Sequence, residues 1–114
     1  FERDYDVLCH GRLPASRNVF ARIFVAGEGP SLTGGRGKLA CSTLRLKRYM
    51  HHQVASLSLL GIRIHTGRKH QIRSQLAFIG HPSVRDCLYT SSVSFISDGR
   101  LCSRNWLHRH RLTF

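Results

Sequence analysis

Acidic residues are scarce in this sequence. Its 114 residues include 18 Lys and Arg but only six Asp and Glu, so the formal net charge is +12 with His neutral. The acids are Glu2, Asp4, Asp6, Glu28, Asp86 and Asp98. No two of them have the setting of a catalytic pair of carboxylates. This imbalance predicts a polyanionic partner, most simply a nucleic acid, with an anionic membrane surface as the second candidate.

Patterns for metal binding, disulfide frameworks and membrane insertion are also missing. The four cysteines form no CxxC pair, so we expect free thiols in a reducing compartment and neither a zinc site nor a disulfide framework. Histidines recur at His51, His52, His108 and His110. Their spacing sets no third ligand, and we predict no metal. There is no apolar run of about 18 residues, so no membrane span is expected, and no motif of a Ser or Cys nucleophile is present.

The length suits one domain or part of one. The sequence begins at Phe1 without a secretory signal and ends at Phe114 inside an alternating pattern. We therefore expect residues 1–114 to be part of a longer protein, incomplete at both ends. Residues 27–38 hold five of the ten glycines, and Arg36 and Lys38 add charge. This composition predicts a flexible, basic, Gly-rich loop.

Hydrophobic periodicity predicts several strands and one main helix. The expected strands are residues 5–11, 19–25, 43–49, 56–65 and 106–114. Ile72, Leu76 and Ile79 form one apolar stripe at helical spacing, and Gly80 can end that helix. We interpret residues 50–53 as a hairpin turn and residues 91–99 as a polar loop. The order of elements predicts an α+β domain built on a mixed, mostly antiparallel sheet.

Residues 65–73 read HTGRKHQIR and are the strongest candidate for a site. A Thr-Gly-Arg turn that leads into a helix exposes N–H groups at the positive helix end, which can bind phosphate. Arg68 and Lys69 would add charge-assisted bonds, although a solvated basic turn is the plainer alternative. Arg73 lies within the amphipathic segment, and a half-buried arginine needs a carboxylate partner. We predict that it pairs with a catalytic acid from elsewhere.

Residues 59–89 closely resemble the C-terminal catalytic motif of the RluA-type RNA pseudouridine synthases. The family pattern is a strand, TGR-x-HQ[IL]R, a helix, and a GHP-x-x-GD-x-x-Y run. In this chain the two segments read TGRKHQIR and GHPSVRDCLY. The match runs from the strand to the tyrosine without a gap. Weaker likenesses flank it. Residues 5–11 look like the family's Tyr-bearing strand that ends in Gly, and residues 107–114 resemble its late LHAHRL-x-F strand.

The resemblance implies an isomerase that converts uridine to pseudouridine in structured RNA, with ribosomal RNA as the expected substrate. In this family an aspartate attacks a flipped nucleotide, the glycosidic bond breaks, and the uracil rejoins through carbon without a cofactor or metal. Base flipping costs a few kcal/mol of stacking. Tyr5 matches the tyrosine that stacks on the base, Arg73 the arginine that pairs with the catalytic aspartate, and Ile72 the apolar residue beside the base. Within the same motif we expect His70 and Gln71 to contact the substrate.

The chain also departs from the family pattern. The family's aspartate lies in an HRLD-type segment before the tyrosine strand, and no such segment occurs here. Either that aspartate precedes Phe1 or the chain is inactive, and the alternative function is an rRNA-binding assembly or structural factor. Arg85 replaces the family's Gly before the motif aspartate, where a tight turn is expected. We expect an intracellular protein of the mitochondrion, the cytoplasm or the nucleolus.

Overall fold

A computed structural model of the chain describes residues 2–52 and 55–109. Within this range it has six strands and two helices. The strands are β1 (Arg3–His10), β2 (Arg17–Phe24), β3 (Leu32–Gly34), β4 (Lys38–His52), β5 (Ala55–Ile64) and β6 (Leu107–Arg109). The helices are α1 (Gln71–Phe78) and α2 (Ser92–Asp98). Neither described helix is long and apolar enough to cross a membrane.

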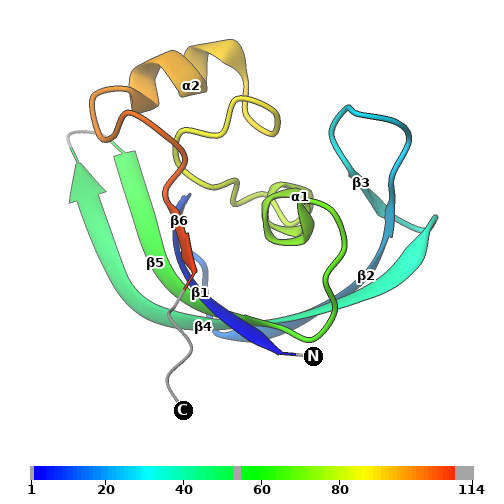
Figure 1. Ribbon diagram of the computed structural model, residues 1–114. Helices are drawn as coiled ribbons and strands as arrows, with labels where there is room; N and C mark the ends of the chain where they lie inside the picture. The colour runs from blue at the N-terminus through cyan, green and yellow to red at the C-terminus, as the bar shows by residue number, and fades with distance from the viewer. Residues whose placement is uncertain (1, 53–54, 110–114) are drawn as a thin grey trace.

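The strands form one sheet in the order β3-β2-β4-β5-β1-β6, and every described pairing is antiparallel. The predicted α+β class with a mostly antiparallel sheet is confirmed. The sheet curves into a trough, and both helices lie on its concave side, with α1 between the two arms (Figure 1). This arrangement gives the sheet a covered inner face and an open outer face.

Alternation along the strands decides which side chains enter the core. Leu60, Ile62 and Ile64 of β5 point inward and pack in one cluster with Ile72 and Leu76 of α1. The predicted apolar stripe is therefore confirmed as the contact between α1 and the sheet. Of the alternate positions of β5, Leu57 and Leu59 pack in a second apolar cluster with Leu8 and Val84, whereas Gly61 and the exposed Arg63 line the open part of the outer face.

The prediction of a single helix and of a polar loop at residues 91–99 is wrong in part, because α2 occupies this segment. The Ser91 side chain caps the helix by accepting the N–H of Ser94. Asp98 at the other end is buried and binds His10 and the backbone N–H of Arg85. The helix is attached through these polar contacts, and its apolar side chains Val93 and Ile96 remain exposed. The segment has no apolar stripe of the kind that packs on a core, so hydrophobic periodicity did not predict α2.

Two loop predictions also change. Strand β4 continues to His52 and β5 begins at Ala55, so residues 50–52 of the expected turn belong to a strand, and its last residue, 53, lies outside the described range. The expected loop at residues 27–38 contains β3, and Lys38 already belongs to β4. Strand β3 pairs with β2 and is tied to α1 by a hydrogen bond between the Thr33 and Ser74 hydroxyls. Long-range contacts thus order a segment whose composition is typical of a loop.

The remaining strand predictions hold with shifted ends. Strand β6 covers Leu107–Arg109, and the rest of the strand predicted at residues 106–114 lies beyond the described range after Arg109. In β4 the register shifts at a bulge between Leu46 and Arg48, which interrupts the alternation expected there.

Candidate active site

The turn before α1 is built around the side chain of Gln71. Its Oε1 accepts the Thr66 hydroxyl at 2.7 Å and the Arg68 N–H at 3.1 Å, while Nε2 donates to the Cys41 carbonyl and the Ser42 hydroxyl, both at 2.9 Å. The side chain is buried. Gln71 was expected to contact the substrate; the structure places it under the turn, where it joins the turn to β4. The amide has no donor or acceptor left to offer a ligand.

Arg73 forms a bidentate ion pair with Asp86. Its Nε and Nη2 lie 2.7 Å from the two carboxylate oxygens, and the exposed fractions of the side chains are 19% for Arg73 and 0% for Asp86. The prediction that Arg73 needs a carboxylate is confirmed. Its partner in the structure is Asp86 of this chain, 13 residues further along. The predicted pairing with a catalytic acid from elsewhere stays a prediction. The sequence signal was present, because Asp86 belongs to the same motif run as the helix.

Asp86 is held by three further hydrogen bonds. It accepts the Ser83 hydroxyl at 3.1 Å and the backbone N–H groups of Leu88 and Tyr89 at 3.1 and 3.2 Å. Burial by itself would raise the pKa of Asp86, but the bonds and charge of Arg73, with the bonds from Leu88 and Ser83, outweigh burial and hold that pKa below its usual range. Asp86 is therefore an ionised anchor that fixes the Arg73 guanidinium.

Tyr89 and His70 complete the surroundings of Arg73. No role was predicted for Tyr89 from its place in the sequence. The Arg73 guanidinium lies over the Tyr89 ring, 5.2 Å from its centroid. The Tyr89 hydroxyl accepts the N–H of Ser31 at 2.7 Å and lies 3.0 Å from Nδ1 of His70. The tautomer of His70 sets which of the two atoms donates in this contact. A Tyr89 hydroxyl that donates to Nδ1 requires a neutral imidazole.

His70 itself begins α1 in a left-handed conformation with φ of 53°. Burial, with the charges of Arg73 and Lys69, lowers the pKa of His70 against the opposing effect of Asp86. A lowered pKa favours the neutral imidazole of His70. His70 thus keeps one ring nitrogen for Tyr89 and leaves the other outside that bond.

Tyr5 lies on β1, opposite Ile62 of β5 and Arg109 of β6. It is half-buried and packs against the core cluster that contains Ile72. Ile72 is itself buried in that cluster, so its expected contact with a base stays a prediction. The fold brings Tyr5 and the start of α1 to the same inner cluster from positions 67 residues apart in the chain.

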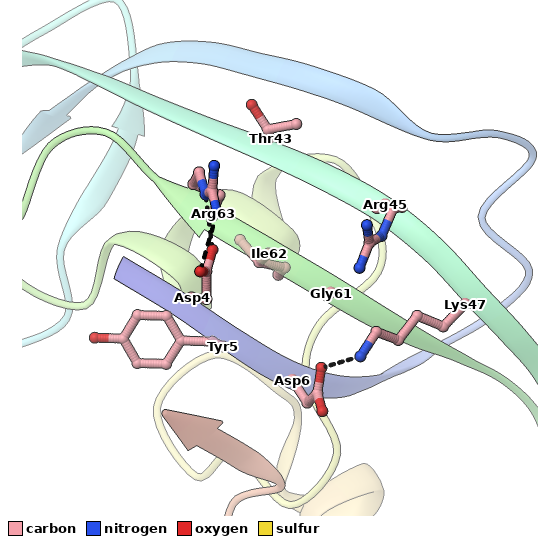
Figure 2. Close-up of a pocket in the computed structure, with 9 residues that line it drawn as sticks. All are labelled: Asp4, Tyr5, Asp6, Thr43, Arg45, Lys47, Gly61, Ile62 and Arg63. Carbon is pink, nitrogen blue, oxygen red and sulfur yellow. Dashed lines mark hydrogen bonds and ion pairs between the residues drawn. The ribbon is translucent and has the colours of Figure 1, made fainter. Parts of the chain in front are cut away.

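Asp4 and Asp6, the neighbours of Tyr5, belong to the outer face. There a hollow of about 370 Å³ opens over Gly61. Figure 2 shows that Asp4 reaches Arg63 and Asp6 reaches Lys47, while the Tyr5 ring points away from both ion pairs. The interpretation that neither acid serves Arg73 agrees with this placement.

Arg68 and Lys69 are half-buried. Arg68 Nε donates to the Leu39 carbonyl at 3.0 Å, and Lys69 Nζ lies 3.2 and 3.3 Å from the carbonyls of Gly27 and Gly29. Both cations are therefore positioned by backbone carbonyls and keep their full charge. Their expected contact with phosphate stays a prediction.

All six acids lie in the described ranges, so they can be assigned in full. Five take part in ion pairs. Glu28 lies on the exposed loop between β2 and β3. Within residues 2–52 and 55–109, Asp86 is the only acid paired with Arg73. The described part of the site can therefore orient a guanidinium and a tyrosine, but it offers no free carboxylate beside them as a nucleophile.

Comparison with known proteins gives a consistent picture. No protein-family model matches the chain. An uncharacterized RNA pseudouridine synthase of Helicobacter pylori is 29% identical over 113 residues, which cover 97% of this chain and 43% of that protein. RNA pseudouridine synthase 5 of rice is 42% identical over 62 residues, which cover 54% of this chain and 15% of the rice protein. The chain thus spans less than half the length of these curated relatives.

Solved structures agree on the fold. Human RNA pseudouridylate synthase domain containing 1 superimposes with a TM-score of 0.83 at 20% identity, covering 95% of this chain and 47% of that one. Human RNA pseudouridylate synthase domain containing 4 gives a TM-score of 0.66 at 18% identity, over 94% and 51% of the two chains. At these identities the likeness shows the fold alone. Together with the named relatives, it supports similarity to the RNA pseudouridine synthases without resolving a subtype.

Proposed function

We propose that this chain supplies the arginine and tyrosine side of an RNA pseudouridine synthase of the RluA type. The complete protein would isomerise uridine to pseudouridine in structured RNA, with ribosomal RNA as the substrate. The observation that carries the proposal is the Arg73–Asp86 pair at the start of α1, next in the chain to Ile72, which belongs to the core cluster against which Tyr5 packs. The curated relatives, which cover nearly the whole chain at 29% identity in one case, support the same reaction class.

The guanidinium of Arg73 has room for a second carboxylate. Asp86 binds the edge formed by Nε and Nη2, whereas a guanidinium carries five N–H donors. Donors on Nη1 and Nη2 therefore stay outside the Asp86 pair. They can bind a nucleophilic aspartate that approaches from a segment outside these 114 residues, through charge-assisted bonds. Asp86 would then act as the anchor and the second aspartate as the nucleophile.

The reaction balances without a cofactor. The aspartate bonds to C1′ of the flipped nucleotide as the bond between C1′ and N1 of uracil breaks, and the uracil turns. C5 then displaces the aspartate from C1′, which frees the carboxylate, and C5 loses its proton while N1 gains one, so the product is an isomer of the substrate. Arg73 would hold the aspartate, and Tyr5 would stack on the base. The bonds around Asp86 fix Arg73 in advance, so it need not reorganise during the reaction.

The test is to map pseudouridine in ribosomal and transfer RNA of cells with and without the gene. We expect deletion to remove at least one site, which the complete protein restores and its Arg73→Ala variant does not. Arg45→Gln, on the outer face of β4, is the matched control and should restore the site. If deletion leaves every pseudouridine in place, the proposal is wrong.

A catalytically inactive rRNA-binding protein is the second candidate, because no described acid other than Asp86 pairs with Arg73. Under this alternative the complete protein binds RNA and forms no pseudouridine. Binding would survive Tyr5→Phe and weaken when the charges of Arg68 and Lys69 are removed. Single-turnover assays on the bound RNA separate the two candidates, since only the enzyme converts a bound uridine.

A further inference from the structure

Two hollows of the described surface differ in their charge balance. The outer hollow over Gly61 is lined by the cations Arg45, Lys47 and Arg63 and by the carboxylates of Asp4 and Asp6. Lys47 Nζ lies 2.8 Å from Asp6, and Arg63 Nε lies 2.8 Å from Asp4 (Figure 2). Two carboxylates against three cations leave one positive charge. The outer hollow is largely neutralised by its own ion pairs.

The second hollow, which we call the basic hollow, has a volume of about 520 Å³. It lies where β2 ends, β4 begins and the Thr-Gly-Arg turn passes. Its lining residues are Ile23, Phe24, Val25, Gly37, Lys38, Gly67, Arg68 and Lys69. Three of these are cations and none is an acid. In the described part of the chain, no carboxylate lies within ion-pair distance of Lys38, Arg68 or Lys69.

The basic hollow is held together by backbone contacts. Gly37, directly before β4, has φ of 91°, and a Cβ on it would lie 2.0 Å from the carbonyl oxygen of Ile23 in β2. Only glycine therefore fits at this position. Arg22 Nη1 donates to the Gly37 carbonyl at 3.0 Å. Carbonyls also hold the side chains of Arg68 and Lys69. The cations are therefore positioned without being neutralised, which keeps them available to an anion.

One wall of the basic hollow is apolar. Ile23 lies in the core, and Val25 at the end of β2 is exposed. The ring of Phe24 carries the Arg36 guanidinium 4.4 Å from its centroid, which adds a fourth cation beside the hollow. An anionic group next to an apolar body fits this combination better than a free inorganic ion does. A phosphodiester supplies the anionic group, and the C–H groups of its ribose can contact the apolar side chains. Basic side chains bind nucleic acids chiefly through phosphate.

We infer that the basic hollow binds one phosphate and the adjoining ribose of the RNA strand that carries the target uridine. This inference rests on the proposed function and names a subsite for it. Gly67, Arg68 and Lys69 of the hollow lie in the same segment as Arg73, and Gln71 fastens that segment to β4. A strand seated on Lys38 and Arg68 is therefore positioned relative to Arg73 by the same turn. A phosphate contact was predicted from the sequence for Arg68 and Lys69. The hollow adds Lys38, the first residue of β4, to these two cations.

The test measures binding of the complete protein to an RNA oligonucleotide as a function of salt. Lys38→Gln should weaken binding severalfold at low salt and reduce the steepness of the log–log salt dependence by about 0.7, the value for one phosphate contact on a single strand. Lys38→Arg should keep both. Arg45→Gln removes one charge from an equally exposed position of the same strand, and it should change the steepness little. Lys38 is exposed, so its substitution leaves the core intact.

Three results would overturn the inference. The first is an equal loss of salt dependence in Lys38→Gln and Arg45→Gln, because net charge alone would then explain binding. The second is unchanged RNA binding in Lys38→Gln. The third is weakened binding of Lys38→Gln to vesicles containing phosphatidylserine with RNA binding unchanged, which would assign the hollow to a membrane surface. Failure of the proposed function would give a different result. The complete protein would bind RNA through Lys38 but form no pseudouridine, and the phosphate subsite would still be supported.

Discussion

Replacing Asp86 by Asn tests whether the buried ion pair holds the active-site helix in place. The substitution keeps the size of the side chain but removes its charge and one of its acceptor oxygens. The native carboxylate accepts five hydrogen bonds, two of them from Arg73 at 2.7 Å. In the variant the Arg73 guanidinium loses the charge opposite it, and the five donor groups are left with one side-chain oxygen.

The magnitude follows from burial. Removing one partner of a buried ion pair costs about 3–5 kcal/mol, because the other charge stays behind unpaired. The Arg73 side chain is 19% exposed and therefore partly hydrated, so we expect the lower end, about 3 kcal/mol. For a complete protein of about 150–250 residues, that loss lowers the melting temperature by about 6–12 °C, at about 2–4 °C per kcal/mol.

Urea and thermal unfolding of the complete protein check this value. Asp4→Asn is the matched control, since Asp4 makes a bidentate pair with Arg63 at 2.8 and 3.2 Å but the two side chains are 45% and 52% exposed. We expect little change there, because solvent screens exposed pairs. If Asp86→Asn unfolds no more easily than Asp4→Asn, burial of the pair does not control its contribution and the reasoning is refuted.

The pH dependence gives an independent check of the same pair. Because the pKa of Asp86 is lowered in the folded protein, the unfolded chain binds its proton first as the pH falls. The stabilisation is therefore complete above the unfolded pKa, about 4, and is lost as the pH falls through the folded value. Asp86→Asn should abolish that part of the acid sensitivity, measured as urea midpoints between pH 5 and pH 2.

Two further predictions concern residues with positive φ. His70 has a lowered pKa, so its protonation disfavours the folded state and stability should fall as the pH drops below about 6.5. His70→Asn, which tolerates the left-handed backbone, should show a smaller difference between urea midpoints at pH 7.5 and 5.5, and an unchanged difference would contradict this. Arg85 has φ of 60° and stacks on Phe95 at 3.9 Å. Arg85→Gly and Arg85→Ala both lose that contact, but only Ala keeps the strain, so the Ala variant should unfold about 1 kcal/mol more easily; equal stabilities would show that the backbone is unstrained.

The strands and α1 were predictable because their signals are local. Alternation and the stripe of Ile72, Leu76 and Ile79 depend only on neighbours in the chain. Helix α2 and β3 were not, because they are secured by polar contacts with distant residues: Asp98 with His10, and Thr33 with Ser74. Residues of this kind resemble those of a loop until the partners are known.

Within the site, residue types and their spacing predicted the basic turn, the helix phase of Arg73 and its need for a carboxylate. The folded chain was needed to show that Asp86 meets this need. It was also needed to show that Gln71 lies beneath the turn and that Lys38 joins Arg68 and Lys69 around one hollow. Each depends on how segments far apart in the chain return to one another, and side-chain pairing across such distances is set by the whole fold.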